Sequence, residues 1–508
     1  MRSSMKKGLW DARAVIEWRL WQNSEVSAAL ENDLKREVKK MTDELQPTSH
    51  ENYEQVMATI ESEHVRFINL EFTDVVGMAK SVTIPVEQFA DCLAHGKWFD
   101  GSALEGFARV AESDMYLYPD LSTFAVLPEQ VRPLPLVDAR WADEVSHDDV
   151  IAHVICNVHT PDGEIFDGDP RATLGRALKL AYSMGYQFKV APELEFFLLR
   201  LEGKKPIPLP HDRGGYFDLS TDLAAKVRRQ MVLVLRAMGI NIEASHHEVA
   251  EGQHELDFAM DDALNIADGL VTAKYVLKAI AAQHGLYATF LPKPFYRVNG
   301  SGLHMHQQLM HRDTGKNAFV DEQEEHGLSD IGRCFIAGQL AHARGICAIL
   351  APLVNSYKRL VRGFEAPVII NWGRINRRAL IRVPRLGTDP DASMRIELRC
   401  SDSSCNPYLA LAVMLQAGLD GIQRKLVLPP AMDEKLFLHD ESERIRPRAR
   451  LLPATLGDAL DDLREDTLIR EALGDSIYEG FVEAKTIDWS DYSEQVHLWE
   501  IERYISVF

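Results

Sequence analysis

Residues 188–199 read FKVAPELEFFLL, and this stretch decides how the rest of the chain is interpreted. It is rich in aromatic and branched residues, which is typical of a β-strand. Side chains on a strand point alternately to its two faces, so Glu193 and Glu195 share one face while Leu194 and Phe196 share the other. Two neighbouring anions on an otherwise apolar strand require cations beside them.

Three further segments repeat this alternation of charged and apolar residues. In QHELDF, the acids Glu255 and Asp257 share a face. In GLHMHQQL the same holds for His304 and His306, and MRIELR alternates charged residues, among them Glu397, with apolar ones. Four strands with apolar backs and charged fronts fit one sheet whose charged face is open. The sequence therefore predicts an acidic floor that holds cations, and this floor is the candidate active site.

Length, charge and cysteine content bound the class of protein. A chain of 508 residues exceeds one compact domain, so we expect a helical extension (1–51), a smaller domain (52–166) and a catalytic domain (167–508). The formal net charge of -20 argues against nucleic acid as a partner. No apolar run reaches the roughly 20 residues of a membrane helix, so we expect no membrane association. Six cysteines without a CxxC pair predict reduced thiols and a cytoplasmic location.

Helices with one apolar stripe are predicted between the charged strands, and we expect them to back the sheet. The expected ranges are 171–184, a helix capped by Thr221 that ends before Gly239, 265–284 and 328–350. A separate, aromatic-rich helix is predicted at the end of the chain, at 496–505. In the smaller domain the pattern predicts strands at 65–72 and 80–84.

The acids and imidazoles of the predicted floor suit Mg²⁺ or Mn²⁺, because these ions prefer carboxylate oxygen with an occasional imidazole. Structural zinc would instead call for closely spaced cysteine and histidine. Five carboxylates and one imidazole are too many for a single octahedral ion that also keeps waters, so we expect two ions. The alternative is that each acid is simply a solvated residue on its strand. That alternative requires charged residues to share one face by chance on all four strands. The candidate ligands are Glu193, Glu195, Glu248, Glu255, His304 and Glu397.

A second group of candidate residues is cationic. Guanidinium groups fork onto phosphate and carboxylate oxygens, so arginines beside a two-metal floor fit phosphoryl transfer from a nucleotide to an anionic acceptor. Neither GxxxxGK[ST] nor GxGxxG occurs, so phosphate binding must rest on metals and arginine. As an alternative, some arginines, foremost Arg378 and Arg385, simply tie the domain together. The candidates are Arg359, Arg377, Arg382, Arg395 and Arg399.

From about Val65 to its end, the chain resembles the glutamine synthetase family of the bacterial and archaeal type. The resemblance rests on ten ordered segments, FDGSALEGF, ESDM, ELEFF, GGYF, HHEVAEGQHE, NGSGLHMH, NSYKRLVRGFEAP, NRRALIRVP, RIELR and NPYLA. It implies an α+β fold, with an N-terminal beta-grasp domain and a C-terminal catalytic domain whose curved antiparallel sheet is backed by helices. It also implies a homo-oligomer of stacked hexameric rings, such as a dodecamer, with active sites shared between neighbouring subunits.

The resemblance also implies a role for each matching residue. Glu195, Glu248 and Glu255 match the ligands of one metal, and Glu193, His304 and Glu397 match those of the other. The residues matching ATP contacts are Glu243, His306, Arg382 and Arg395. Those matching glutamate contacts are Asn299, Gly300, Arg359 and Arg399. Those matching the ammonium site are Tyr216, Asp114 and Asp100, the last supplied by the neighbouring subunit.

The implied activity is ATP-dependent ligation of ammonia to the γ-carboxylate of L-glutamate, giving L-glutamine, ADP and phosphate. A carboxylate is a poor electrophile, so ATP first converts it to γ-glutamyl phosphate, while two cations and Arg377 offset the charge on the phosphoryl oxygens. Ammonium must lose a proton before it attacks, which suits the anions Asp100 and Glu365. Closure of Glu365 over the site would shield the acyl phosphate from water.

Two departures from the family pattern leave alternatives open. The usual FDGSS is FDGSA here, so Ala103 lacks a hydroxyl that helps to hold ammonium. A γ-glutamyl ligase that uses an organic amine, either a polyamine or a monoamine, is therefore the alternative. Gln308 replaces the serine usual after the second histidine, which could alter the nucleotide contact. A non-catalytic, ring-forming scaffold is the third hypothesis.

Overall fold

The computed structural model describes residues 50–102, 114–131, 149–203, 205–208, 214–219, 222–385, 387–432 and 451–508. The chain divides into two compact units, Met1–Met57 and Ala58–Phe508, and the packing described below lies within the second. The predicted helical extension falls largely outside the described residues, and the predicted boundaries at residues 51 and 166 stay predictions. None of the helices in the described ranges combines the length and apolar character needed to cross a membrane.

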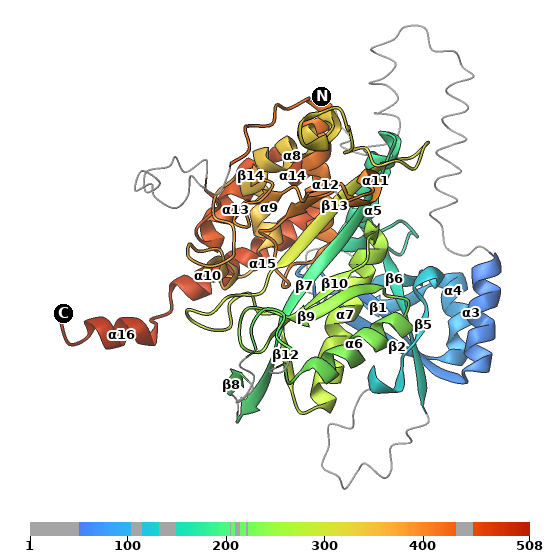
Figure 1. The fold of residues 1–508 in the computed structure, drawn as a ribbon. Helices are drawn as coiled ribbons and strands as arrows, with labels where there is room; N and C mark the ends of the chain where they lie inside the picture. The colour runs from blue at the N-terminus through green and yellow to red at the C-terminus, as the bar shows by residue number, and fades with distance from the viewer. Residues whose placement is uncertain are drawn as a thin grey trace, which may run out of the picture. The chain divides into compact units, whose positions relative to one another are not determined.

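The first sheet of the described part has the strand order β2-β1-β6-β4-β3, with β5 beside β6. Strands β1, β2, β5 and β6 of this sheet are labelled in Figure 1. Strands β1 and β6 run parallel, whereas the other pairs are antiparallel. Its buried side chains include Ile68, Leu70, Val154 and Val158, and both predicted strands are confirmed. The elements are β1 (Val65–Thr73), β2 (Ala79–Pro85), α4 (Phe89–His95), β3 (Lys97–Asp100), β4 (Asp114–Pro119), β5 (Ala125–Val126) and β6 (Val150–His159).

The second sheet is built around the 17-residue strand β7 (Tyr186–Glu202), and its order is β14-β15-β16-β13-β7-β10-β9 in the described part. Strands β8, β11 and β12 also pair with β7, and only β14 and β15 are parallel among these described pairs. The other strands are β8 (Lys205–Pro208), β9 (Ile242–His247), β10 (Gln253–Phe258), β11 (Asp261–Asp262), β12 (Tyr287–Thr289), β13 (Leu303–His311), β14 (Trp372–Gly373), β15 (Ile381–Arg382) and β16 (Ile396–Leu398).

The four strands with charged faces are neighbours in this sheet, as the sequence predicts. Their order is β16-β13-β7-β10. Glu195 lies opposite Glu255, and Glu193 lies between Asp257 on one side and His304 on the other. Because paired residues of neighbouring strands point to the same face, this register places the acids and imidazoles together.

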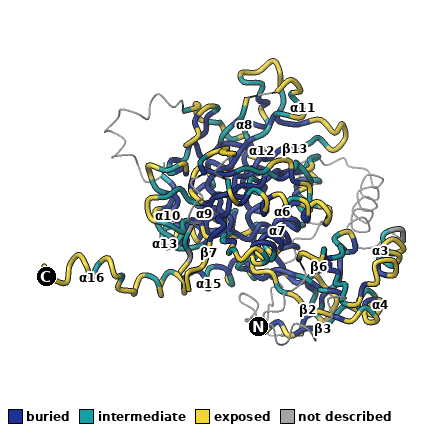
Figure 2. The backbone as a smooth tube through the Cα atoms, turned by 60° about the horizontal axis from the view of Figure 1, so that its bottom comes forward, coloured by how far each residue is buried: buried dark blue, intermediate teal, exposed yellow. Residues whose placement is uncertain are grey.

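Helices pack against the second sheet and fill the core, which gathers around β7, α9 and α12, whereas α16 is exposed (Figure 2). Each packed helix has apolar residues at every third or fourth position, and these residues form the stripe that faces the core. The helices are α5 (Pro170–Ser183), α6 (Ala225–Ala237), α7 (Ala263–Gln283), α8 (Asp330–Ala341), α9 (Ala343–Leu350), α10 (Ser356–Arg359), α11 (Pro390–Ser393), α12 (Pro407–Gln423), α13 (Leu456–Glu465), α14 (Thr467–Leu473), α15 (Asp475–Ser493) and α16 (Leu498–Tyr504), after α3 (His50–Ser62).

Two of the predicted helices differ from the structure. The helix expected at 328–350 is two helices, α8 and α9, which meet at His342. His342 Nδ1 lies 2.8 Å from Asp466 Oδ2, and its Nε2 lies 3.1 Å from Asp420 Oδ2, so these ion pairs fix the imidazole at the break. The helix predicted to follow Thr221 begins at Ala225, and its N-cap residue Ala224 makes no side-chain capping hydrogen bond; Thr221 itself lies outside the described residues.

A buried arginine joins the first sheet to the helices of the second. Arg171, at the start of α5, donates from Nε and Nη2 to both carboxylate oxygens of Asp268 on α7, at 3.0 and 2.8 Å. Its Nη2 also donates to Asp120 at 2.8 Å, and its Nη1 donates to Asn157 on β6 at 2.8 Å. The hydroxyl of Tyr408 on α12 donates to Asp268 at 2.7 Å. The Arg171 guanidinium therefore connects α5 directly to α7 and β6 and to Asp120, and it is linked to α12 through Asp268.

Candidate active site

A cavity of about 540 Å³ opens on the charged face of the second sheet. All six predicted metal ligands line it, together with eight other predicted site residues. The fourteen are Glu193, Glu195, Glu248, Glu255, His304, Glu397, Tyr216, Asn299, Gly300, Arg359, Glu365, Arg377, Arg382 and Arg399. The structure thus brings together, from separate parts of the chain, most of the residues that the sequence singled out.

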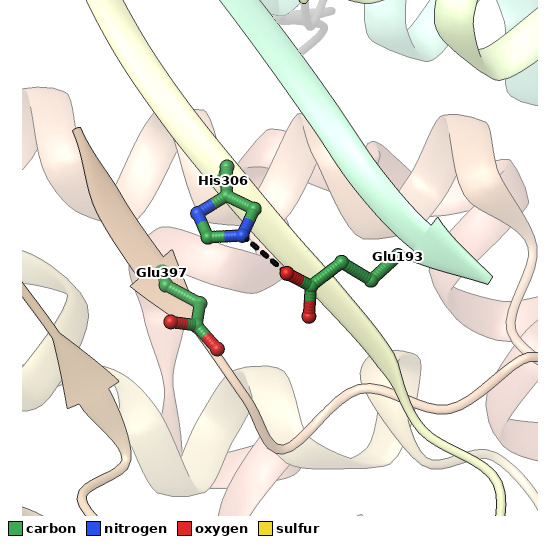
Figure 3. Close-up of side chains that lie close together, drawn as sticks. All are labelled: Glu193, His306 and Glu397. Carbon is green, nitrogen blue, oxygen red and sulfur yellow. Dashed lines mark hydrogen bonds and ion pairs between the residues drawn. The ribbon is translucent and has the colours of Figure 1, made fainter. Parts of the chain in front are cut away.

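One group of possible metal ligands consists of Glu193, His306 and Glu397, with ligand atoms that lie within 4.8 Å of one another. Figure 3 shows His306 and Glu193 pointing toward each other, and His306 Nε2 lies 2.8 Å from Glu193 Oε1. The other oxygen of Glu193 lies 2.9 Å from His304 Nδ1, which is also 3.8 Å from Glu397 Oε1. Strands β7, β13 and β16 each supply a member, so their pairing creates the group.

A second group consists of His246, Glu248 and Glu255, again within 4.8 Å. His246 Nε2 lies 3.3 Å from Glu255 Oε1. Glu195 lies between the two groups. Its Oε1 lies 3.8 Å from His304 Nε2, beside the first group, and its strand position is paired with that of Glu255 in the second group. Its Oε2 accepts hydrogen bonds from the Gln253 side chain and the Gly302 amide, at 3.0 and 2.9 Å, which fixes the carboxylate.

His246 was not among the metal ligands predicted from the sequence. The signal was present, because His246 and Glu248 are two positions apart where β9 ends, and such residues share a face of an extended chain. The predicted division into two ligand sets, with His304 in one of them, stays a prediction. Asp257, Phe217 and Phe364 also line the cavity, and no role had been assigned to them.

The acids of the floor have unequal proton affinities. Burial and the neighbouring Glu195 raise the pKa of Glu248 to about 8. Burial and the same neighbour raise the pKa of Glu255 well above its usual value. Burial opposes ionisation of Glu193, but hydrogen bonds to His304 and His306 outweigh it and lower the pKa of Glu193. The acids of the second group therefore hold protons more tightly than Glu193 does, because their ionised forms would repel one another.

The donor set fits hard divalent cations. It consists of carboxylates and imidazoles, and the buried Nε2 of His304 and Nδ1 of His306 have no hydrogen-bond partner. Carboxylates that are placed together to bind a cation repel one another when no cation is near, and this repulsion raises their pKa values. The residues present therefore fit the predicted metal ions.

Two arginines flank the floor through Glu397, whose side chain is completely buried. Arg382 and Arg399 both donate to this carboxylate. Burial alone would raise the pKa of Glu397, but Arg399 and His306 lower it to about 2. Glu397 therefore stays ionised and fixes both guanidinium groups at the edge of the cavity.

Arg359 is buried and is held by main-chain carbonyls. It donates to the carbonyls of Arg399, Cys400 and Ser401, each at 3.1 Å. Burial lowers its pKa. A Cβ added at Gly302 would lie 2.4 Å from Arg359 Nη2, so only glycine leaves room for this guanidinium. Its placement in the cavity suits an anionic substrate group.

Five predicted site residues do not line the cavity, although His306 reaches it through Glu193. Asp100 and Asp114 face each other across β3 and β4, and Trp98 Nε1 donates to Asp114 at 2.9 Å. The remaining two are Glu243, on β9, and Arg395, directly before β16. Ala103 lies outside the described residues.

Gln308 has a structural contact that the sequence did not reveal. Its amide nitrogen donates to the carbonyls of Ala392 and Met394, at 3.2 and 2.9 Å. The side chain therefore fixes the main chain that leads into Arg395. The altered nucleotide contact predicted for Gln308 stays a prediction.

An acidic floor with imidazoles, faced by arginines, defines a class of enzyme that handles anionic substrates with divalent metal ions. Residues 167–504 match the catalytic domain of glutamine synthetase, and residues 64–161 match the glutamine synthetase beta-grasp domain. The chain belongs to the glutamine synthetase family. The predicted α+β fold, with its beta-grasp domain and curved sheet, is confirmed.

Individual relatives cover most of the chain. The glutamine synthetase of Thermus thermophilus is 47% identical over 458 residues, which are 89% of this chain and 99% of the relative. That of Clostridium saccharobutylicum is 45% identical over 90% of this chain and 99% of the relative. A solved structure of a GmaS/ADP complex is 30% identical, with a TM-score of 0.77, and covers 89% of this chain and 99% of its own. GmaS without ligand gives a TM-score of 0.76 at 30% identity over 88% and 98% of the two chains. The predicted ligase activity is thereby confirmed as that of the family.

The raised pKa of Glu248 predicts how pH affects the metal-free protein. A folded-state pKa near 8, against about 4.5 when unfolded, means that the folded state holds a proton that the unfolded chain releases. This group's stabilising contribution is complete below about pH 4.5 and is lost as the pH rises to about 8, by up to roughly 1.4 kcal/mol per pH unit. Thermal unfolding in EDTA should show wild type losing stability relative to Glu248→Gln over this range.

Bound Mn²⁺ should reverse this trend, because the metal replaces the proton and its apparent affinity rises with pH. The melting curves of wild type with Mn²⁺ provide the control. Parallel pH profiles of metal-free wild type and Glu248→Gln would contradict the raised pKa.

Proposed function

We propose that this protein ligates ammonia to the γ-carboxylate of L-glutamate at the expense of ATP, through γ-glutamyl phosphate. The observation that carries the proposal is that two groups of possible metal ligands and arginines held by buried contacts meet at one cavity. The glutamine synthetases of Thermus thermophilus and Clostridium saccharobutylicum support it, since they match nearly end to end. We place the activity in the cytoplasm.

Two Mg²⁺ or Mn²⁺ ions are proposed for each site. Glu195, Glu248 and Glu255 would hold one, and His246 is close enough to contribute. Glu193, His304 and Glu397 would hold the other ion. When bound, such ions withdraw charge from phosphoryl oxygens and so favour phosphoryl transfer.

The arginines orient the two anionic substrates. Arg359 and Arg399, with Asn299 and Gly300, are proposed to bind glutamate, because fixed guanidiniums fork onto carboxylates. A Cβ at Gly300 would lie 2.1 Å from the carbonyl oxygen of Pro292, so the main chain there is closely packed. The residues proposed to bind ATP are Glu243, His306, Arg382 and Arg395.

Proton removal from ammonium is proposed for Glu365 and for Asp100 of a neighbouring subunit, in stacked hexameric rings. Both carboxylates attract the cation and then accept its proton. Tyr216 completes the proposed ammonium pocket, with Asp114 beside Asp100. Burial is the main cause, and the charge of Glu248 the second, of a rise in the pKa of Tyr216 to about 12, so its hydroxyl stays protonated. Arg377 steadies the transferring phosphoryl group.

A second candidate is a γ-glutamyl ligase that uses a polyamine or monoamine. Ala103 favours it, because the missing hydroxyl removes one group that would hold ammonium. The solved relatives named GmaS leave the acceptor open, since their name differs from that of the glutamine synthetases.

One assay separates the candidates. Phosphate release from ATP and glutamate should rise at least tenfold on adding ammonium, and much less with putrescine or ethylamine. Ammonium inactive and an amine active would establish the second candidate. Absence of release with every acceptor would favour a non-catalytic scaffold. Omission of Mg²⁺ and Mn²⁺ serves as the control.

A further inference from the structure

The main chain of Lys293 is held in place by the side chain of Asn355. The side-chain oxygen of Asn355 accepts a hydrogen bond from the Lys293 amide at 2.7 Å. The side-chain nitrogen of Asn355 donates to the Lys293 carbonyl at 3.1 Å. Both main-chain polar groups of Lys293 are thus held by one side chain, which fixes where its long side chain begins.

The ammonium group of Lys293 contacts two segments that carry predicted site residues. It donates a hydrogen bond to the carbonyl of Val298, the residue directly before Asn299 and Gly300. It also lies 3.5 Å from the centroid of the Phe364 ring, and Phe364 directly precedes Glu365. A cation this close to a ring face is strongly attracted to it. One charge therefore joins the loop of Asn299 to the segment of Glu365.

The segment that carries Glu365 is largely exposed. Arg362, Gly363 and Glu365 are exposed, and the chain becomes buried again at Ala366. Gly363 has a φ of +94°, which makes it a natural hinge, because glycine adopts this conformation without strain. The ring of Phe364 ties this exposed stretch to Lys293.

We propose that Lys293 is a positioning residue that latches the Glu365 segment over the cavity and aligns it with the loop that contacts glutamate. The proposal rests on the proposed function, in which Glu365 closes over an acyl phosphate. Without the latch, the segment opens more often and water reaches the intermediate. ATP is then consumed without formation of the amide.

The test compares amide formed with phosphate released. Lys293→Met keeps the length of the side chain and removes its charge, so the ratio of amide to phosphate should fall about 3- to 30-fold, the range that one cation–π contact allows. Lys293→Arg should restore most of the ratio. Phe364→Ala should reproduce the part of the defect that comes from the cation–π contact, and the double variant should be no worse than Lys293→Met alone, because both changes remove that contact.

The matched control is Lys278→Met. Lys278 lies 5.8 Å from the centroid of the Phe290 ring, outside the cavity lining, so its removal should leave the ratio unchanged. An unchanged ratio in Lys293→Met, or additive losses in the double variant, would overturn the proposal. Should Lys293→Met fail to fold, Phe364→Ala carries the same test.

A second readout does not depend on activity. Arg362 is exposed, so trypsin can cleave after it when the segment opens. Cleavage at this bond, followed by mass spectrometry, should be faster in Lys293→Met than in wild type or Lys278→Met. Faster cleavage in a protein that ligates no acceptor would refute the proposed function and leave the latch standing. If Lys293→Met and wild type are cleaved at the same rate and wild type ligates ammonia to glutamate, the latch is refuted and the proposed function stands.

Discussion

Replacement of Glu397 by alanine is expected to reduce ligase activity by about 10²- to 10³-fold. It should also lower the free energy of unfolding by about 3–5 kcal/mol, because removing one partner of a buried ion pair leaves uncompensated charge. Glu397 is completely buried and accepts hydrogen bonds from Arg382 and Arg399. Its loss therefore leaves two guanidinium groups without their carboxylate beside the floor.

Urea denaturation measured in EDTA isolates the effect on stability from the effect on metal binding. Glu397→Gln is the matched control, because it keeps the shape and one acceptor while removing the charge. Its activity should fall as far as that of the alanine variant, with a smaller loss of stability. An alanine variant as stable as wild type would show that the buried carboxylate does not hold the two arginines.

The second large effect is expected at Arg171. Substitution by methionine should lower the free energy of unfolding by about 3–5 kcal/mol, because Asp268 and Asp120 lose their shared cation. The residue lies outside the cavity lining, so kcat per folded molecule should change little. Chemical denaturation, with activity normalised to folded protein, measures both.

Arg176→Met, on the same helix, provides the comparison. Arg176 bonds to the Thr173 hydroxyl and the Leu473 carbonyl, so its loss should cost at most about 1.5 kcal/mol. Adding Asp268→Asn to Arg171→Met should restore part of the stability, because the unpaired carboxylate is then neutral. Equal losses for Arg171→Met and Arg176→Met would argue against the network as the link between the layers.

The acidic floor could be predicted because strand periodicity is strict. A two-residue alternation assigns each side chain to a face, so Glu193, Glu255 and His304 were placed correctly without knowledge of the pairing. Composition and spacing within single segments carried all of this information. The order of the strands in the sheet was not predicted and comes from the structure.

What could not be predicted depends on contacts between distant segments. The break at His342 follows from Asp420 and Asp466, which lie 78 and 124 residues further along the chain. Arg171 resembles any helical arginine until Asp268 is placed against it. Lys293 is likewise positioned by contacts with Asn355 and Phe364, and no local sequence pattern links these residues to it.

The central strand β7 pairs with β13 and β10 along its edges and carries β8, β11 and β12 as well. Backbone that is bonded on both sides opens only when the whole domain unfolds. The acids Glu193 and Glu195 therefore lie on a strand that is paired on both sides, so a cation bound between them would not have to order the backbone that carries its ligands. Such an ion would also lower the repulsion between ionised acids that folding brings close together.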